Sequence, residues 1–382
     1  MTPSRAPPPL RILHCLRAPV GGLFRHVLDL AREQSELGHA VGLLADETTG
    51  DRLTEMRLDA LRPALALGVA RTAMSRNPSP RDLRAAAFTA ELARRLHADV
   101  MHGHGAKGGA FARLAARRIN GKGKRTAAFY TPHGGSLNYA PGTIEARVFL
   151  GIEKMLVRYT DGVVFESAHA ARIFAERVAP IDRLGRVIPN GLQPADFIKH
   201  LPEADAAEFL FVGELRDLKG VDVLLHALAE VNKSRPARAV IVGSGPDGAR
   251  FEQLAKDLGL GRLVTFPGAM PAREAFTRGH IIVVPSRKES FPYIVLEAGA
   301  AGVPLLTTGV GGIPEMLSGS DTPMLPPGDV GALAGEMRYA LENGPEMQAR
   351  ARQFKAIVAD RYTVSGMTDA IVAFYRERLH SY

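Results

Sequence analysis

Short apolar runs alternate with stretches of helical periodicity along almost the whole chain. From Leu10 the apolar runs LRILHCL, AVGLLAD, DVMHGHG and RTAAFYT alternate with helical patterns at 23–37, 83–96 and 111–119. After a polar segment at 193–206 the cycle restarts, with the runs EFLFVGE, ARAVIVGSG, RLVTFPG and HIIVVP and a helical pattern at 221–231. Alternation of this kind predicts a parallel sheet wrapped by helices. The sequence therefore predicts an α/β protein with two doubly wound domains in tandem.

The expected divisions are residues 1–195 for a first domain, 196–360 for a second, and 361–382 for a final amphipathic helix. In that last segment Met367, Ile371, Phe374 and Tyr375 recur at helical spacing. The chain has 382 residues, of which 46% are hydrophobic and 23% charged, which is enough for two apolar cores.

No uncharged apolar run approaches the roughly 18 residues that span a bilayer, and the first residues lack the apolar core of a signal peptide. We therefore expect a cytoplasmic protein. The single cysteine, Cys15, lies in an apolar run, so it is expected to be a buried small residue rather than a nucleophile.

Positive charge is concentrated in the first half of the chain. Residues 1–195 hold 28 Lys and Arg against 17 Asp and Glu, a charge of +11, whereas residues 196–382 hold 20 against 23, a charge of −3. A basic first domain would suit an anionic membrane surface at the inner face of the cell membrane, or a polyanionic acceptor. The alternative is an ordinary solvated basic face. No nucleic-acid partner is expected.

Two carboxylates flank a short segment that joins an apolar strand to a helix. Glu289 lies in the polar turn after the strand at 280–284, and Glu297 lies on the helix expected to open at Pro292. The first backbone N–H groups of that helix, from Phe291 to Ile294, would face an anion, with Phe291, Pro292 and Tyr293 expected to bind the donor. The arrangement suits sugar hydroxyls and a diphosphate. The alternative is that Glu289 offsets the helix dipole and that Glu297 is simply solvated.

This segment resembles the Glu, seven residues, Glu motif of the retaining glycosyltransferases of family 4. The stretches Gly302-Val303-Pro304-Leu305-Leu306 and Gly311-Gly312-Ile313-Pro314-Glu315 continue the pattern in register. The resemblance implies a GT-B fold, with two Rossmann-like domains facing a cleft and the final helix crossing back to the first domain. It also implies a nucleotide sugar as donor, which the second domain would bind.

Lys219 and Arg216 follow the first strand of the second domain, where open α/β sheets bind ligands. In the resembled family a lysine and an arginine neutralise the donor's diphosphate. In that family the arginine usually follows the glycine directly. Here Glu214 follows Gly213, so Arg216 would have to extend to the diphosphate from two positions further along the chain.

Two further loops carry weaker signals. Gly21 and Gly22 form a glycine turn that allows a phosphate or sugar to approach the backbone, or that only makes a tight connection. Pro267 lies where the family's loop contacts the nucleotide base through backbone groups. Such contacts leave uridine, guanosine and adenosine open, with a UDP or GDP sugar as the first expectation.

His133 follows a predicted strand and precedes Gly134-Gly135. It resembles the family histidine that faces the donor sugar, where it would donate or accept a hydrogen bond at the reacting centre. His102 and His104 flank Gly103 and raise the question of a metal. No third ligand or acidic cluster lies nearby at metal spacing, so no metal and no cofactor are expected.

The function expected from this resemblance is retaining transfer of a sugar from a nucleoside diphosphate to a hydroxyl acceptor. His133, Glu289, Lys219 and Arg216 would act at the reacting centre. The acceptor would be a saccharide or a lipid-linked saccharide in exopolysaccharide or capsule synthesis. Two alternatives remain open: a sugar-nucleotide epimerase of the same architecture, and a non-catalytic scaffold that binds membranes or polyanions.

Overall fold

The computed structural model describes residues 7–50, 52–76, 79–120, 125–140, 142–197 and 201–380. The chain divides into two compact units, which are described separately. Unit 1 runs to residue 191 and takes in residue 364 onward, and unit 2 comprises 192–363. The sequence placed these divisions at 195 and 360.

Unit 1 is built on a seven-stranded sheet in which neighbouring strands are parallel. In spatial order the strands are β3 (Gly68–Thr72), β2 (Ala40–Asp46), β1 (Arg11–Leu16), β4 (Val100–His104), β5 (Ala127–Thr131), β6 (Gly162–Phe165) and β7 (Gly185–Val187). Leu16 pairs with His104, and His104 pairs with Thr131. The carboxyl ends of the three central strands therefore lie side by side.

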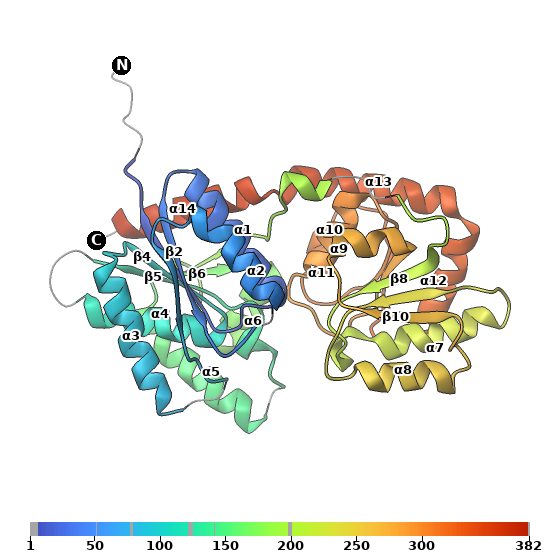
Figure 1. Ribbon diagram of the computed structural model, residues 1–382, viewed down its shortest axis with the longest axis horizontal. Helices are drawn as coiled ribbons and strands as arrows, with labels where there is room; N and C mark the ends of the chain where they lie inside the picture. Colours follow the sequence, from blue (N-terminus) through green and yellow to red (C-terminus); the bar gives the residue numbers. More distant parts are fainter. Residues whose placement is uncertain are drawn as a thin grey trace, which may run out of the picture. The chain divides into compact units, whose positions relative to one another are not determined.

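Helices cover both faces of this sheet. They are α1 (Gly21–Glu36), α2 (Arg52–Leu61), α3 (Arg81–Arg95), α4 (Gly105–Ile119), α5 (Ile144–Leu156), α6 (Ala168–Arg177) and α14 (Val364–His380). Side chains alternate along β1, so Leu13 packs in a cluster with α3 and α4, whereas Ile12 packs with α14. The last helix, α14, lies beside α1 and against β5 and β6 (Figure 1).

Unit 2 has a six-stranded sheet in which the paired strands are also parallel. In spatial order the strands are β10 (Val264–Gly268), β9 (Ala239–Val242), β8 (Ala207–Val212), β11 (Gly279–Val284), β12 (Leu305–Thr308) and β13 (Met324–Leu325). The helices are α7 (Val221–Asn232), α8 (Gly248–Asp257), α9 (Ala272–Ala275), α10 (Tyr293–Ala301), α11 (Ile313–Met316), α12 (Val330–Glu342) and α13 (Gly344–Arg361).

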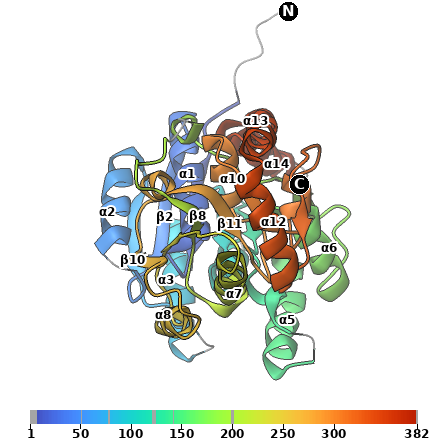
Figure 2. The ribbon, with the colours of Figure 1, turned by 90° about the vertical axis from the view of Figure 1, so that its right-hand side faces the viewer.

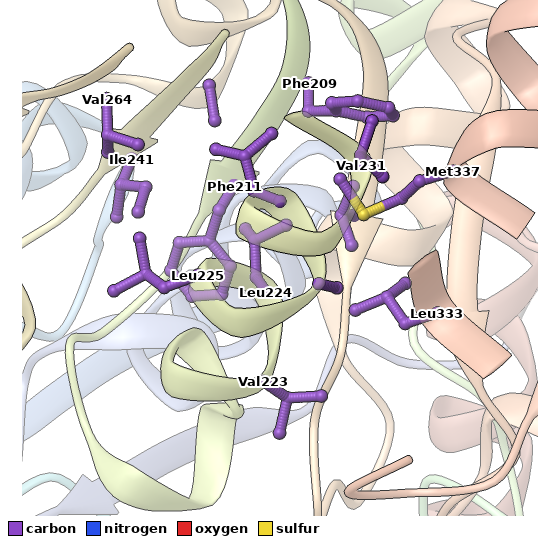
Figure 3. Close-up of a cluster of buried hydrophobic side chains, with 14 of the residues drawn as sticks. Phe209, Phe211, Val223, Leu224, Leu225, Val231, Ile241, Val264, Leu333 and Met337 are labelled. Carbon is purple, nitrogen blue, oxygen red and sulfur yellow. The ribbon is translucent and has the colours of Figure 1, made fainter. Parts of the chain in front are cut away.

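Two apolar layers hold unit 2 together. On one face α7, α8 and α12 pack against the sheet, as seen around β8 and β11 in Figure 2. Figure 3 shows Phe211 of β8, Leu225 of α7 and Ile241 of β9 in that layer. On the other face α10 and α13 contact each other and bury Val295 and Phe354. The architecture of two doubly wound α/β sheets is the one predicted.

Among the described helices, none combines the length and the apolar character that crossing a bilayer requires.

Candidate functional site

The ion pair between Lys219 and Glu289 is the centre of the candidate site in unit 2. The Lys219 Nζ donates to both carboxylate oxygens of Glu289, at 2.7 and 2.9 Å. The Glu289 side chain is only 7% exposed and the Lys219 side chain 22% exposed. The hydroxyl of Ser286 also donates to Glu289 Oε1, at 2.7 Å. The structure thus joins two predicted site residues that are 70 positions apart, and it fixes the Glu289 carboxylate in one orientation.

Close backbone crossings hold the two loops that carry this pair. Gly220 has φ +70°, and a Cβ at this position would lie 2.0 Å from the carbonyl oxygen of Pro285. Gly311 has φ +61°, and a Cβ there would lie 1.9 Å from the carbonyl oxygen of Glu289. Both positions require glycine, because a side chain would clash with backbone and the left-handed conformation is costly for other residues. These close backbone contacts fix the positions of the loops that carry Lys219 and Glu289.

Arg287 holds the loop that carries Glu289 in place, a role that was not predicted from the sequence. Its guanidinium makes two hydrogen bonds to the Asp222 carboxylate, at 2.7 and 2.6 Å, and a third to the carbonyl oxygen of Asp217 at 2.8 Å. Burial would raise the pKa of Asp222, but the hydrogen bonds from Arg287 outweigh it and the pKa lies below its usual range. The only signal in the sequence was an acidic residue in the first turn after Lys219 and a basic residue shortly before Glu289.

Arg216 is positioned differently from Lys219. Its side chain is 42% exposed, and among the described residues its ion pair is with Glu214, at 3.7 Å. No hydrogen bond joins Arg216 to Glu289, so the structure does not bring it into the Lys219–Glu289 pair. Gly213 directly follows β8, and its carbonyl oxygen would lie 1.8 Å from a Cβ on Gly243. Pro267 lies exposed on β10, the edge strand beside β9.

The start of α10 departs in one respect from the prediction. The helix begins at Tyr293 with Pro292 as its N-cap, and proline has no N–H to offer an anion. Phe291 and Tyr293 are buried, at 5% and 7% exposure, and their side chains belong to the apolar layer. Any role for these residues in binding a ligand therefore falls to the backbone. Glu297 lies one turn into the helix and is partly buried.

In unit 1 the predicted glycine turn forms the start of α1. Gly21 is the first residue of the helix and has φ +64°, and a Cβ added to it would meet no atom within 4 Å, so its backbone conformation alone favours glycine. Gly22 follows it within the helix. The first turn of α1 carries no acidic residue, and its N-cap, Val20, makes no side-chain hydrogen bond to it.

Five histidines gather at the carboxyl edge of the sheet in unit 1. They are His14 of β1, His26 of α1, His102 and His104 of β4, and His133 in the loop after β5. Burial lowers the pKa of His14 to about 4 and the pKa of His133 to about 3. Burial also lowers the pKa values of the other three well below the ordinary range. All five imidazoles are therefore neutral at pH 7.

A chain of hydrogen bonds links three of these rings. His14 Nε2 donates to Gln34 Oε1 at 2.8 Å, and a neutral imidazole that donates at one nitrogen accepts at the other. His14 Nδ1 therefore accepts from His104 Nε2 at 2.9 Å. His104 Nδ1 in turn accepts from His133 Nε2 at 3.1 Å. With these proton positions, His133 Nδ1 carries no proton and can only accept a hydrogen bond. The sequence had left open whether His133 donates or accepts.

A cavity of about 370 Å³ in unit 1 borders His104 and His133. Its apolar wall includes Leu23, Phe111, Leu114, Phe149 and Ile152, and its charged groups are Arg17, Arg76, Lys107, Asp82 and Glu153.

Only some of these charges are paired within the protein. Lys107 pairs with Asp82 at 2.5 Å, and Glu153 accepts a hydrogen bond from the buried Arg113 at 2.9 Å. Neither of the other two cations, Arg17 and Arg76, forms a hydrogen bond or ion pair with another described residue. Burial lowers the pKa of Arg17; nearby Asp46 opposes this shift, and Arg76 adds to it. The cavity therefore combines an apolar wall with two neighbouring cations.

Two family models match the chain in succession. The model described as Glycosyltransferase Family 4 matches residues 20–196, and the model described as Glycosyl transferases group 1 matches residues 193–356. The chain therefore belongs to the family 4 type of glycosyltransferases, as the sequence motifs predicted.

Individual relatives agree with this assignment. A D-inositol 3-phosphate glycosyltransferase of Acidothermus cellulolyticus is 29% identical over 414 residues, which is 97% of this chain and 88% of that protein. The enzyme of the same name from Gordonia bronchialis is 33% identical over 190 residues, 45% of this chain and 40% of that protein. A glycogen synthase of Mycobacterium tuberculosis is 31% identical over 229 residues, 58% of this chain and 55% of that protein. For these last two the match spans about half of the relative's length.

Solved structures show the same fold at low sequence identity. HepE of Anabaena, in complex with UDP and glucose, has a TM-score of 0.81 at 19% identity, over 96% of this chain and 100% of that chain. Sucrose-phosphate synthase of Thermosynechococcus elongatus has a TM-score of 0.78 at 19% identity, over 97% of this chain and 100% of that chain. The predicted GT-B fold is confirmed.

His133, in the loop after β5, has a backbone conformation that is unfavourable for a residue with a side chain, and this strain can be tested. His133 has φ +50°, and Gly134, which follows it, has φ +76°. Because this conformation costs a residue with a Cβ about 1 kcal/mol relative to glycine, His133→Gly should unfold at a higher urea concentration than His133→Ala. Both variants lose the imidazole, so their difference isolates the backbone. At exposed Arg84 within α3 the order should reverse, with alanine favoured by about 1 kcal/mol. Equal stability of the two His133 variants would contradict the account.

Proposed function

We propose that this protein transfers a sugar from a nucleoside diphosphate sugar to a hydroxyl acceptor with retention of the anomeric configuration. The observation that carries the proposal is the Lys219–Glu289 pair, held at the carboxyl edge of unit 2 by two glycine crossings and by Arg287. It places a cation and a fixed hydroxyl acceptor together, next to the N-terminal end of a helix. These are the groups that recognise a sugar diphosphate.

Unit 2 is the proposed donor site. An ammonium group has three N–H donors. Lys219 donates two hydrogen bonds to Glu289, so its third N–H is available for a phosphate oxygen. Glu289 would accept from a hydroxyl of the donor sugar, and Glu297 from the ribose. The complex of HepE with UDP and glucose supports a uridine nucleotide, and a GDP sugar is the second candidate.

The leaving diphosphate gains negative charge as the sugar departs. Lys219, an approaching Arg216 and the first N–H groups of α10 would stabilise that charge, so the proposed reaction requires no metal ion. Attack on the same face as the departing phosphate would let that phosphate accept the proton from the acceptor hydroxyl. His133, as an acceptor at Nδ1, would orient a hydroxyl at the reacting centre.

The cavity in unit 1 is the proposed acceptor site. Arg17 and Arg76 suit a phosphate or carboxylate, and the wall that contains Phe111 and Phe149 suits an apolar chain. We therefore favour an anionic, lipid-linked saccharide acceptor at the inner face of the cell membrane, in exopolysaccharide or capsule synthesis. The D-inositol 3-phosphate glycosyltransferases among the relatives have, by their name, a phosphorylated acceptor.

Replacement of Lys219 tests the donor site. Lys219→Ala should lower turnover about 10²- to 10³-fold, because it removes one preorganised donor to the leaving group. The matched control is Lys233→Ala, since Lys233 is 70% exposed and pairs with Glu230 in the same way. The measurement is release of nucleoside diphosphate in the presence and absence of acceptor, with folding checked by circular dichroism. Full turnover in folded Lys219→Ala would reject the proposal, and an epimerised sugar formed from donor alone would favour the epimerase alternative.

The acceptor site predicts a preference for an anionic head group. By thermal shift, a short-chain prenyl phosphate should stabilise the protein more than the matching prenyl alcohol. Arg17→Gln and Arg76→Gln should each weaken phosphate binding by roughly 10-fold or more, since hydrogen bonds to charged groups contribute about 1.5 to 3 kcal/mol. Equal shifts with phosphate and alcohol, or unchanged binding in both variants, would exclude this acceptor class.

A further inference from the structure

Three of the five histidines bring ring nitrogens close together. His26, His104 and His133 each offer one nitrogen, and the three atoms lie within 4.8 Å of one another. The rings come from three different elements, namely α1, β4 and the loop after β5. The sequence argument against a metal rested on the lack of a third ligand near His102 and His104. That premise is wrong, because the fold supplies one from distant positions.

The spacing of these rings is close to that of a tetrahedral site. Zinc binds imidazole nitrogen at about 2.0 to 2.1 Å, so two nitrogens on one tetrahedral ion lie about 3.3 Å apart and their ring centroids about 5 Å apart. His104 Nδ1 and His133 Nε2 are 3.1 Å apart. The three centroid distances are 4.8 Å for His26–His133, 5.5 Å for His26–His104 and 5.4 Å for His104–His133. Small side-chain adjustments would therefore complete the geometry.

Outer hydrogen bonds already orient two of the rings for this role. A histidine that binds a metal through one nitrogen usually donates its other N–H to a fixed acceptor. His104 Nε2 donates to His14 Nδ1 at 2.9 Å, and His26 Nδ1 donates to Asn190 Oδ1 at 2.9 Å. The remaining nitrogen of His26, Nε2, is buried and has no hydrogen-bond partner among the described residues. A buried lone pair without a partner is costly, and a metal ion would satisfy it.

We infer that His26, His104 and His133 form a binding site for a divalent transition-metal ion, with Zn²⁺ as the favoured ion. Three neutral nitrogen ligands without a carboxylate suit zinc and exclude the oxygen-seeking Mg²⁺ and Ca²⁺. Because His104 and His133 line the cavity, a fourth ligand can enter from there. Binding requires the proton on His133 Nε2 to move to Nδ1, which replaces the His133–His104 hydrogen bond by two bonds to the metal. In the metal-bound protein His133 Nδ1 would therefore donate a hydrogen bond, whereas in the metal-free protein it accepts one.

A second histidine trio is less suited to a metal. His14, His102 and His104 also place ring nitrogens within 4.8 Å of one another. Both nitrogens of His102 are engaged, however, by Tyr375 Oη at 2.5 Å and by Thr131 Oγ1 at 2.8 Å. All three rings are fully buried, and neither His14 nor His102 lines the cavity, so the site lacks an open fourth position.

Metal titration of the full chain tests the inference without any substrate, so its outcome is separate from that of the proposed transfer activity. After dialysis against EDTA, calorimetry with ZnCl₂ should show one site per chain, and Co²⁺ should give the intense visible absorption of a tetrahedral ion. His26→Ala and His133→Ala should each weaken binding by at least about 100-fold, and Asn190→Ala by roughly 10- to 100-fold. His226→Ala, on the exposed side of α7, should bind as the wild type does.

Two results would overturn the inference: no saturable Zn²⁺ binding by the wild-type protein, or binding that His26→Ala and His133→Ala leave unchanged. If either variant does not fold by circular dichroism, the milder Asn190→Ala variant and the Co²⁺ spectrum of the wild type decide. A weak octahedral spectrum would also count against the site.

Discussion

Parallel strands place their carboxyl ends on the same edge of a sheet, and the position of every candidate group in both units depends on this constraint. In unit 2 the segments after β8 and β11 emerge side by side, so Lys219 meets Glu289 across 70 residues of chain. In unit 1 the same arrangement of β1, β4 and β5 gathers the histidines. Glycines at Gly220 and Gly311 then let the loops approach more closely than side chains would allow.

The two edges handle charge in opposite ways. In unit 2 the cations are paired before any ligand arrives, since Lys219 bonds Glu289 and Arg287 bonds Asp222. Such pairs keep the side chains oriented, so little reorganisation is needed when a diphosphate binds. In unit 1 burial keeps the histidines neutral, and two of the three cations beside the cavity, Arg17 and Arg76, make no ion pair with another described residue. The carboxyl edge of unit 2 is therefore suited to a ligand that binds to an existing ion pair such as Lys219–Glu289. The carboxyl edge of unit 1 is suited to an anionic ligand that pairs with Arg17 and Arg76.

The sequence predicted both sheets, because alternating apolar runs and helical periods determine a doubly wound fold locally. Lys219 and Glu289 were also predictable, since each follows a clear strand. Arg287 and the meeting of His14, His26 and His133 were not, because these contacts join positions far apart in sequence and no local spacing reports them. The strands β3, β6, β7, β12 and β13 and the helices α2, α5, α6, α12 and α13 were not among the predicted elements. The prediction also included Pro292 among the residues whose backbone N–H groups face the ligand, but proline has no backbone N–H.

The central claim is that the carboxyl edge of unit 2 binds a nucleoside diphosphate through the start of α10 and Glu297. Isothermal titration of wild type and Glu297→Ala with UDP, GDP and ADP tests it most directly. The account predicts saturable binding of one of these nucleotides by the wild type, UDP first, and a loss of roughly 10- to 100-fold in Glu297→Ala, because a hydrogen bond to a charged group contributes about 1.5 to 3 kcal/mol. Absence of binding by all three nucleotides, or equal affinity in the variant, would contradict it.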